Sequence, residues 1–81
     1  EGFYSEKDSI CDCIYDREKG YLKIRCDIPR LKGEYKLDAI TLDRFRLGTS
    51  ADYYVTFLRQ DGMIVGIELK VSGMKLRLKK K

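Results

Sequence analysis

The chain has 81 residues and carries 17 basic and 13 acidic side chains, which give it a net charge of +4. This length leaves room for a single domain, and a hydrophobic content of 43% is too high for a disordered tail. Histidine is missing, so the chain alone cannot assemble a Ser-His-Asp or Cys-His mechanism or an imidazole metal site.

The start of the chain is Glu1 rather than methionine. We therefore expect residues 1–81 to be one domain cut from a longer protein. The chain has no basic-then-apolar signal segment and no apolar run long enough to span a bilayer. We expect no membrane contact within this piece.

Residues 22–28 alternate between apolar and charged side chains, which is the period of a β-strand. The apolar face of this predicted strand consists of Leu22, Ile24, Cys26 and Ile28. Pro29 should end the strand because proline lacks a backbone donor.

A hairpin is expected just before that strand, around Glu18-Lys19-Gly20. A three-residue loop would pair Ile14 with Ile24, whereas a two-residue loop would put Cys11 opposite Cys26. Both registers remain open at this point.

The middle of the chain has weaker signals. Gly33 and Gly48 are expected to mark turns. In segment 34–42 the apolar residues Leu37 and Ile40 are three apart, so a bulge or a short turn is needed to keep a strand in phase.

The last third, residues 53–79, predicts three strands joined by two tight turns. The first turn, at Gln60-Asp61-Gly62, predicts a three-residue loop. That loop pairs Arg59 with Met63, Phe57 with Val65 and Val55 with Ile67. It also places Met63, Val65, Ile67, Leu69 and Val71 in one apolar row.

The second turn, Ser72-Gly73, suits a two-residue connection. It pairs Val71 with Met74, Leu69 with Leu76 and Ile67 with Leu78, so that the apolar faces of the two strands coincide. No window of ten or more residues shows a helical stripe. The sequence therefore predicts an all-β fold, a small antiparallel meander of seven to eight strands that forms a closed or half-open barrel.

The three cysteines, Cys11, Cys13 and Cys26, allow several interpretations. They can be small buried hydrophobic residues, or one cross-strand disulfide to Cys26 with one thiol left free. A soft-metal site is the third alternative, but a structural zinc site needs a fourth ligand that the chain does not offer. Their redox state is not decided by the sequence, and we expect no metal site.

Ser72-Gly73-Met74-Lys75 matches the Ser-x-x-Lys motif of penicillin-recognising enzymes. That motif works at the start of a helix, where one turn brings the lysine beside the serine. Here Ser72 belongs to a predicted turn and Lys75 begins a predicted strand. We therefore expect no catalytic or cofactor-binding residue, and no enzyme activity from this chain alone.

Basic residues gather at the end of the chain: Lys75, Arg77, Lys79, Lys80 and Lys81. They can form a solvated strand face with a frayed tail, or a patch for phosphates. Acidic residues elsewhere and core or rim positions for most aromatic residues argue against a nucleic-acid platform. We expect neither a nucleic-acid partner nor a small-molecule ligand.

Several short motifs resemble a known family. Gly2-Phe3-Tyr4 resembles a Gly-x-Tyr opening, and Asp43-Arg44-Phe45 resembles an Asp-x-Phe element after a short apolar segment. Asp61-Gly62 followed by 65–69 resembles an Asp-Gly-x-Val-x-Gly-hydrophobic pattern. In this order the motifs resemble the C-terminal, lipocalin-like β-domains of bacterial β-lactamase-related, penicillin-binding serine hydrolases. The three cysteines are not part of that pattern.

The resemblance implies that residues 1–81 are a single β-domain, the C-terminal piece of a longer protein. It further implies an accessory role, namely packing on or capping the N-terminal hydrolase domain of the same chain, which carries the catalytic residues. It also implies an extracytoplasmic or membrane-associated parent protein. The alternatives are a small barrel that binds an apolar molecule in its mouth and one that binds nucleic acid through the basic last strand.

Overall fold

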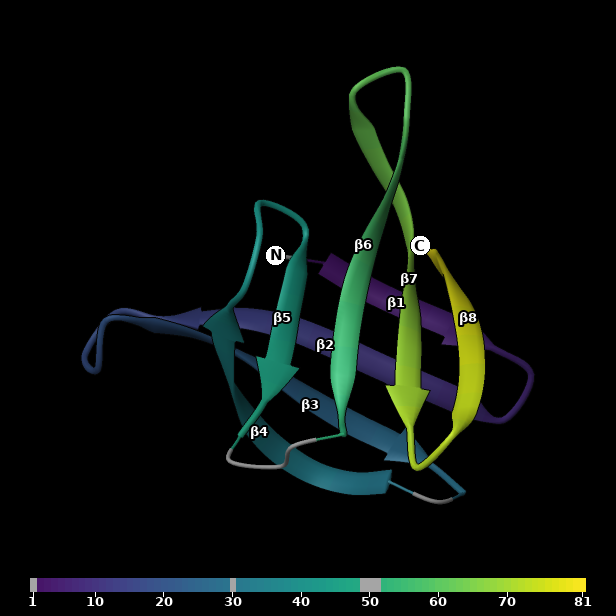
Figure 1. The fold of residues 1–81 in the computed structure, drawn as a ribbon, viewed down its shortest axis with the longest axis horizontal. Coiled ribbons are helices and arrows are strands. Elements are labelled where there is room, and N and C mark those ends of the chain that lie inside the picture. The colour runs from purple at the N-terminus through teal and green to yellow at the C-terminus, as the bar shows by residue number, and fades with distance from the viewer. Residues whose placement is uncertain (1, 30, 49–51) are drawn as a thin grey trace.

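Eight antiparallel strands form the fold in a computed structural model, which describes residues 2–29, 31–48 and 52–81. Each strand is hydrogen-bonded to the next, and the last closes on the first, so the barrel is closed (Figure 1). Glu1, where the predicted domain begins, lies outside the described residues. The strands are β1 (Gly2–Glu6), β2 (Ser9–Asp16), β3 (Tyr21–Ile28), β4 (Leu31–Ala39), β5 (Arg44–Leu47), β6 (Tyr54–Gln60), β7 (Met63–Val71) and β8 (Met74–Lys80).

The predicted all-β meander is thus confirmed, with eight strands and a closed barrel. In Figure 1 strands β1–β3 run roughly horizontally, β5–β8 run roughly vertically, and β4 curves between the two sets. The barrel closes through a short pairing between its last strand and its first. Strand β8 meets β1 through the pairs Tyr4–Lys80 and Ser5–Lys79, and β4 meets β5 through three residue pairs beginning at Leu37–Leu47.

The barrel interior is filled by side chains from all eight strands. Phe57 is central: its ring stacks edge-on against Phe45 at 5.5 Å between centroids and lies 6.3 Å from the ring of Tyr4. Alternation along each strand sends one set of residues inward. The buried apolar residues are Tyr4, Cys11, Cys13, Ile24, Cys26, Ile28, Leu31, Leu37, Leu47, Val55, Phe57, Ile67, Leu69, Val71 and Leu78.

The register of β7 and β8 is confirmed. Val71 pairs with Met74, Leu69 with Leu76 and Ile67 with Leu78. The two turn residues, Ser72 and Gly73, both have positive φ, as a tight hairpin turn requires.

The predicted register of β6 and β7 is wrong near the turn. The connection is the two-residue turn Asp61-Gly62, whose φ values of 55° and 81° suit a tight hairpin. Gln60 pairs with Met63, and a bulge follows in which Val65 is the extra residue of β7. Beyond the bulge Phe57 pairs with Ile67 rather than with Val65.

This bulge changes which side chains face inward. Met63 is 71% exposed and Val65 is 43% exposed, so neither belongs to the apolar row that the sequence predicted. The row is correct from Ile67 onward, where Ile67, Leu69 and Val71 are buried.

In the β2–β3 hairpin the structure selects one of the two open registers. Cys11 lies opposite Cys26, and the strands end at Asp16 and Tyr21 with residues 17–20 between them. Strand β3 ends at Ile28, as Pro29 predicted.

The glycine predictions have mixed outcomes. Gly48 follows β5 with a φ of 58°, as a turn residue does. The turn at Gly33 is wrong, because Gly33 lies inside β4 opposite Cys26, with a φ of 124°. In segment 34–42 a turn after Ala39 supplies the predicted change of phase.

Candidate functional site

The three thiols are buried and unbridged. The sulfurs of Cys11 and Cys26 lie 3.4 Å apart, within hydrogen-bond distance for two thiols. That bond, followed by burial, raises the pKa of Cys11, and burial raises the pKa of Cys13 to about 12. Cys11 and Cys13 are therefore protonated at neutral pH. Across the part of the chain that the structure describes, no group of potential ligands could hold a metal ion.

Ser72 and Lys75 do not share a helix turn. Ser72 lies in the β7–β8 turn, and its hydroxyl is 3.1 Å from the hydroxyl of Tyr53. Lys75 lies on β8 opposite Lys70. The helical setting that the Ser-x-x-Lys mechanism uses is therefore not what surrounds these two residues.

Two partly exposed tyrosine rings are covered by cations of the same chain. The guanidinium of Arg44 lies 4.5 Å from the ring centre of Tyr54, and the ammonium of Lys36 lies 5.2 Å from that of Tyr21. Phe57 is in the core, as predicted. These rings are thus already engaged on one face and do not form a bare stacking platform.

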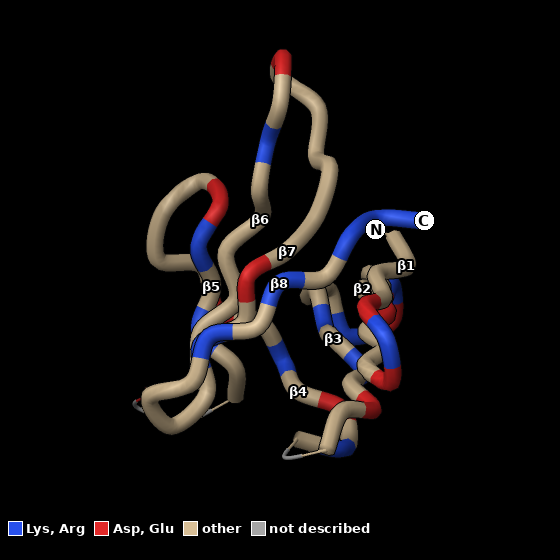
Figure 2. The backbone as a smooth tube through the Cα atoms, turned by 90° about the vertical axis from the view of Figure 1, so that its right-hand side faces the viewer, with Lys and Arg blue, Asp and Glu red and all other residues tan. Residues whose placement is uncertain are grey.

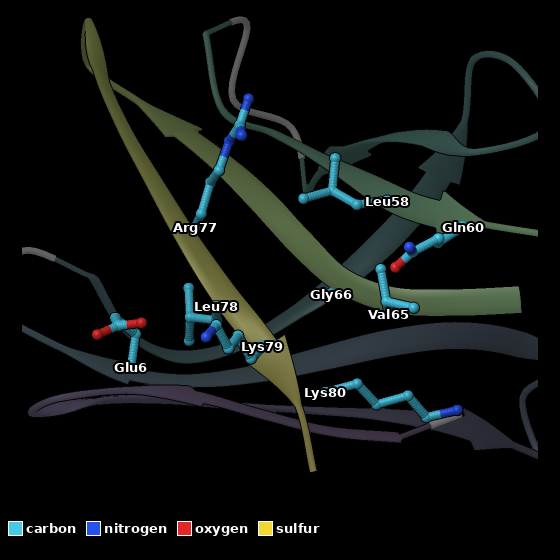
Figure 3. Close-up of a pocket in the computed structure, with 9 residues that line it drawn as sticks. All are labelled: Glu6, Leu58, Gln60, Val65, Gly66, Arg77, Leu78, Lys79 and Lys80. Carbon is cyan, nitrogen blue, oxygen red and sulfur yellow. The ribbon is translucent and has the colours of Figure 1, made fainter.

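A groove of about 420 Å³ runs between the end of β8 and β6–β7 (Figure 3). Arg77, Lys79 and Lys80 contribute positive charge to its wall, and Leu58 and Val65 contribute apolar surface. The basic residues predicted at the end of the chain therefore gather here in part, as the blue run along β8 in Figure 2 also shows. Arg77 is paired with Glu68 at 2.9 Å, which reduces the free charge of the groove.

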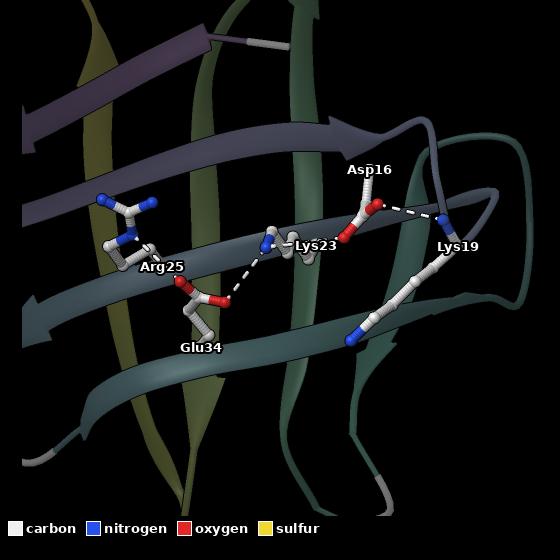
Figure 4. Close-up of polar contacts among 5 residues, drawn as sticks. All are labelled: Asp16, Lys19, Lys23, Arg25 and Glu34. Carbon is white, nitrogen blue, oxygen red and sulfur yellow. Dashed lines mark hydrogen bonds and ion pairs between the residues drawn. The ribbon is translucent and has the colours of Figure 1, made fainter.

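The outer face of β2, β3 and β4 carries both signs of charge. Lys23 lies 3.2 Å from Glu34 and 3.7 Å from Asp16, and Arg25 lies 3.4 Å from Glu34 (Figure 4). A face on which each cation meets a carboxylate offers little net attraction to a polyanion.

Three pKa values on this face depart from their ordinary values. The hydrogen bond from Lys23 lowers the pKa of Glu34 below its ordinary 4.5, and the same bond raises the pKa of Lys23 above 10.5. The backbone N–H of Lys19 lowers the pKa of Asp16 below 3.8. A lowered carboxyl pKa stabilises the fold above the ordinary value and ceases to do so as pH falls through the folded-state pKa. The raised pKa of Lys23 stabilises the fold below 10.5, and this contribution disappears as pH rises through the folded-state value.

Replacing Lys23 by methionine will flatten the acid limb of the stability profile. Glu34 and Asp16 both lose their shared partner, so less stability disappears as the pH falls below 4.5. Melting temperatures measured from about pH 7 down to about pH 2 test this. Lys32→Met is the control, because Lys32 lies 3.8 Å from Asp27 with both side chains 74% exposed. Identical acid limbs for the two variants would contradict the assignment.

The tip of the β6–β7 hairpin and the turn between β4 and β5 project from one end of the barrel, as Figure 1 shows. We call residues 58–66 the β6–β7 arm and residues 40–43 the β4–β5 turn. Their exposed apolar residues form what we call the apolar rim: Ile40, Leu42, Met63 and Val65. Leu42 is 84% exposed, the largest value among the exposed large hydrophobic residues of the described chain.

Polar contacts hold the two loops together. The Nε of Arg59 donates to both carboxylate oxygens of Asp43, at 2.8 and 2.9 Å, and its Nη1 donates to the Gly62 carbonyl at 3.0 Å. The backbone N–H of Phe57 also donates to the Asp43 carbonyl at 2.8 Å. The arm is therefore tied both to its own tip and to the β4–β5 turn, and these contacts order the apolar rim.

Replacing Arg59 by methionine will loosen the two loops without unfolding the barrel. The pair is partly exposed, so its loss should cost at most about 1 kcal/mol of unfolding free energy. Hydrogen exchange at residues 40–44 and 59–63 should accelerate, while β2 and β3 keep their protection. A variant with unchanged exchange in both loops would show that Arg59 does not organise them.

The sequence did not predict the apolar rim. It placed Met63 and Val65 in the core, because an unbroken period-two row extends through both. The Asp61-Gly62 pair was the signal that could have corrected this, since that dipeptide favours a two-residue turn.

We compared the chain with protein-family models, curated proteins and solved structures, and found no match. In residues 2–29, 31–48 and 52–81, no helix has the length and apolar character needed to cross a membrane.

Proposed function

We propose that the chain is a non-catalytic β-barrel module that packs its apolar rim against a neighbouring protein domain. The observation that carries this proposal is the rim itself, four exposed apolar residues on the β4–β5 turn and the β6–β7 arm, which lie at one end of the barrel. Apolar residues grouped on an ordered protrusion are typical of protein contact sites.

The filled interior supports the same proposal. Inward positions of β3, β6 and β7 hold Ile24, Phe57 and Ile67, and such residues pack the barrel rather than line a binding cavity. An apolar ligand in the barrel mouth, the alternative from the sequence, would have to displace them. The module therefore acts through its surface.

The resemblance in the sequence supplies the partner for this proposal, a β-lactamase-related serine hydrolase domain in the same polypeptide. The matching residues have structural roles that such a pattern would preserve. Asp61-Gly62 makes the turn of the arm, and at Gly66 an added Cβ would lie 2.6 Å from the Leu78 carbonyl oxygen of β8. These roles are consistent with an accessory β-domain whose chemistry belongs to its neighbour.

Hydrogen exchange on the full natural polypeptide, compared with the 81-residue chain alone, tests the proposal. Residues 40–43 and 62–65 should exchange more slowly in the full polypeptide, while the charged face of β3 and β4 serves as an internal control and should not change. Exchange that is equal at the rim in both forms would overturn the docking proposal.

A double substitution sharpens this experiment. Leu42→Ser with Met63→Ser should abolish the difference at the rim, whereas Lys32→Ser on β4 should leave it intact. The encoded sequence upstream of the chain decides the hydrolase part separately. A Ser-x-x-Lys motif at a helix start there would support it, and an upstream region without one would contradict it.

A further inference from the structure

We propose that Cys11 and Cys26 are a redox-responsive pair that a small-molecule disulfide converts to a cross-strand disulfide, leaving Cys13 as the free thiol. This proposal is independent of the docking function. It rests on strand register and on the positions of the three sulfurs.

The pair already has the geometry that a disulfide needs. Cys11 and Cys26 are directly opposite one another on β2 and β3, and their sulfurs are 3.4 Å apart. Opposite residues of antiparallel strands have Cα atoms about 4.5–5.5 Å apart, which lies within the range that disulfides span. A disulfide has its sulfurs about 2 Å apart, so closure requires a movement of somewhat more than 1 Å between the two side chains.

Cys13 is excluded by the same register. It lies opposite Ile24, so Cys26 is its diagonal neighbour across the sheet. Diagonal residues are about 7–8 Å apart, beyond the usual disulfide span. Cys11 and Cys13 are two positions apart on one strand, with parallel side chains that do not approach each other. Only one of the three pairings is therefore ready to close.

The neighbours of the pair leave it space to adjust. One row of directly paired residues crosses β1, β2, β3 and β4 and consists of Tyr4, Cys11, Cys26 and Gly33. Gly33 has no side chain on the β4 flank of Cys26, and a Cβ built there would approach nothing closer than 3.9 Å. The β4 residue opposite Cys26 therefore places no side chain beside the pair.

The reaction is thiol–disulfide exchange with a small-molecule disulfide such as oxidised glutathione. The thiolate of one cysteine attacks that disulfide, forms a mixed disulfide and releases one thiol. The second thiolate attacks the protein sulfur and releases the second thiol. Two protons and two electrons leave the pair, and the small disulfide is reduced to two thiols. Both sulfurs are buried, so the reaction proceeds during folding or opening of the barrel.

The test is to refold the reduced chain in excess oxidised glutathione, block free thiols with an alkylating reagent and measure the mass. Apart from the blocking group, we expect a disulfide-linked product about 2 Da lighter than the reduced chain. This product should carry one blocked thiol. Tandem fragmentation should place the block on Cys13 and the link between Cys11 and Cys26. A link through Cys13, or three blocked thiols, would overturn the proposal.

Two variants provide the matched comparison. Cys13→Ala should form the link to the same extent as the natural chain, and Cys11→Ala should form none. The oxidised natural chain should melt about 10 °C higher than the reduced chain, because the link closes a loop in the unfolded state. The mapping on the natural chain needs no variant to fold, and equal melting temperatures for both forms would contradict the stabilising effect.

Discussion

Replacing Gly66 by alanine will destabilise the barrel by about 1–3 kcal/mol. A Cβ at this position would lie 2.6 Å from the carbonyl oxygen of Leu78 on β8. That oxygen belongs to the backbone, so it cannot rotate away as a flexible side chain would. Relief requires β7 and β8 to separate where Gly66 pairs with Lys79, and this weakens the ladder that positions the arm. Urea denaturation followed by circular dichroism measures the change.

Gly2→Ala is the matched control for this effect. It adds the same methyl group to a strand glycine, but the nearest atoms are side-chain atoms, the Tyr4 hydroxyl at 3.2 Å and the Lys80 Cε at 3.3 Å. The lysine chain can move, so we expect a loss below about 1 kcal/mol. Equal losses for Gly66→Ala and Gly2→Ala would show that the close approach of β7 and β8 is not the cause.

Replacing Leu69 by alanine will cost about 2–5 kcal/mol, because it leaves a cavity at a fully buried position. Leu69 on β7 is paired with Val55 on β6 and with Leu76 on β8. A chain of 81 residues has a total stability of about 4–12 kcal/mol, so this one change removes a large share of it.

Leu42→Ala removes the same atoms from the apolar rim. Leu42 is exposed, so the free energy of unfolding should change by less than about 0.5 kcal/mol. Equal losses for Leu69→Ala and Leu42→Ala in denaturation experiments would contradict the division into core and rim that the proposed function uses.

The fold was predictable where turn chemistry and side-chain alternation agree. Ser72-Gly73 fixes a two-residue turn, and the flanking strands each have a single apolar face, so one register satisfies both. The β2–β3 hairpin was less clear, because apolar residues occupy both faces of β2. Cys11 and Cys13 point inward, yet Ile10 and Ile14 on the other face allowed a second register that the sequence could not exclude.

The β6–β7 arm could not be predicted for a different reason. A bulge adds one residue to a strand and so changes which side chains face inward beyond it. In the sequence, however, the alternating apolar row from Met63 to Val71 continues through Val65 without a break. The pattern therefore hides the change of face, and Met63 and Val65 were assigned to the core. The apolar rim became visible only when the turn and the bulge were placed in three dimensions.

Ion pairs were also hidden in the sequence. Asp16, Lys23 and Glu34 come from three strands, and their meeting depends on two registers being correct at once. Composition predicted a basic last strand, but it could not show that Glu68 neutralises Arg77 across β7 and β8. Contacts between distant residues follow from topology rather than from local pattern.

We propose that the barrel is filled by its own side chains and acts through its surface. The most direct test is an NMR titration of the chain with a long-chain fatty acid, observing the methyl groups of Ile24, Ile67 and Leu69. We predict that these interior resonances do not move, even if rim residues such as Leu42 respond. A saturable shift of the interior methyl groups would mean that the barrel opens to hold a ligand, and would contradict the account.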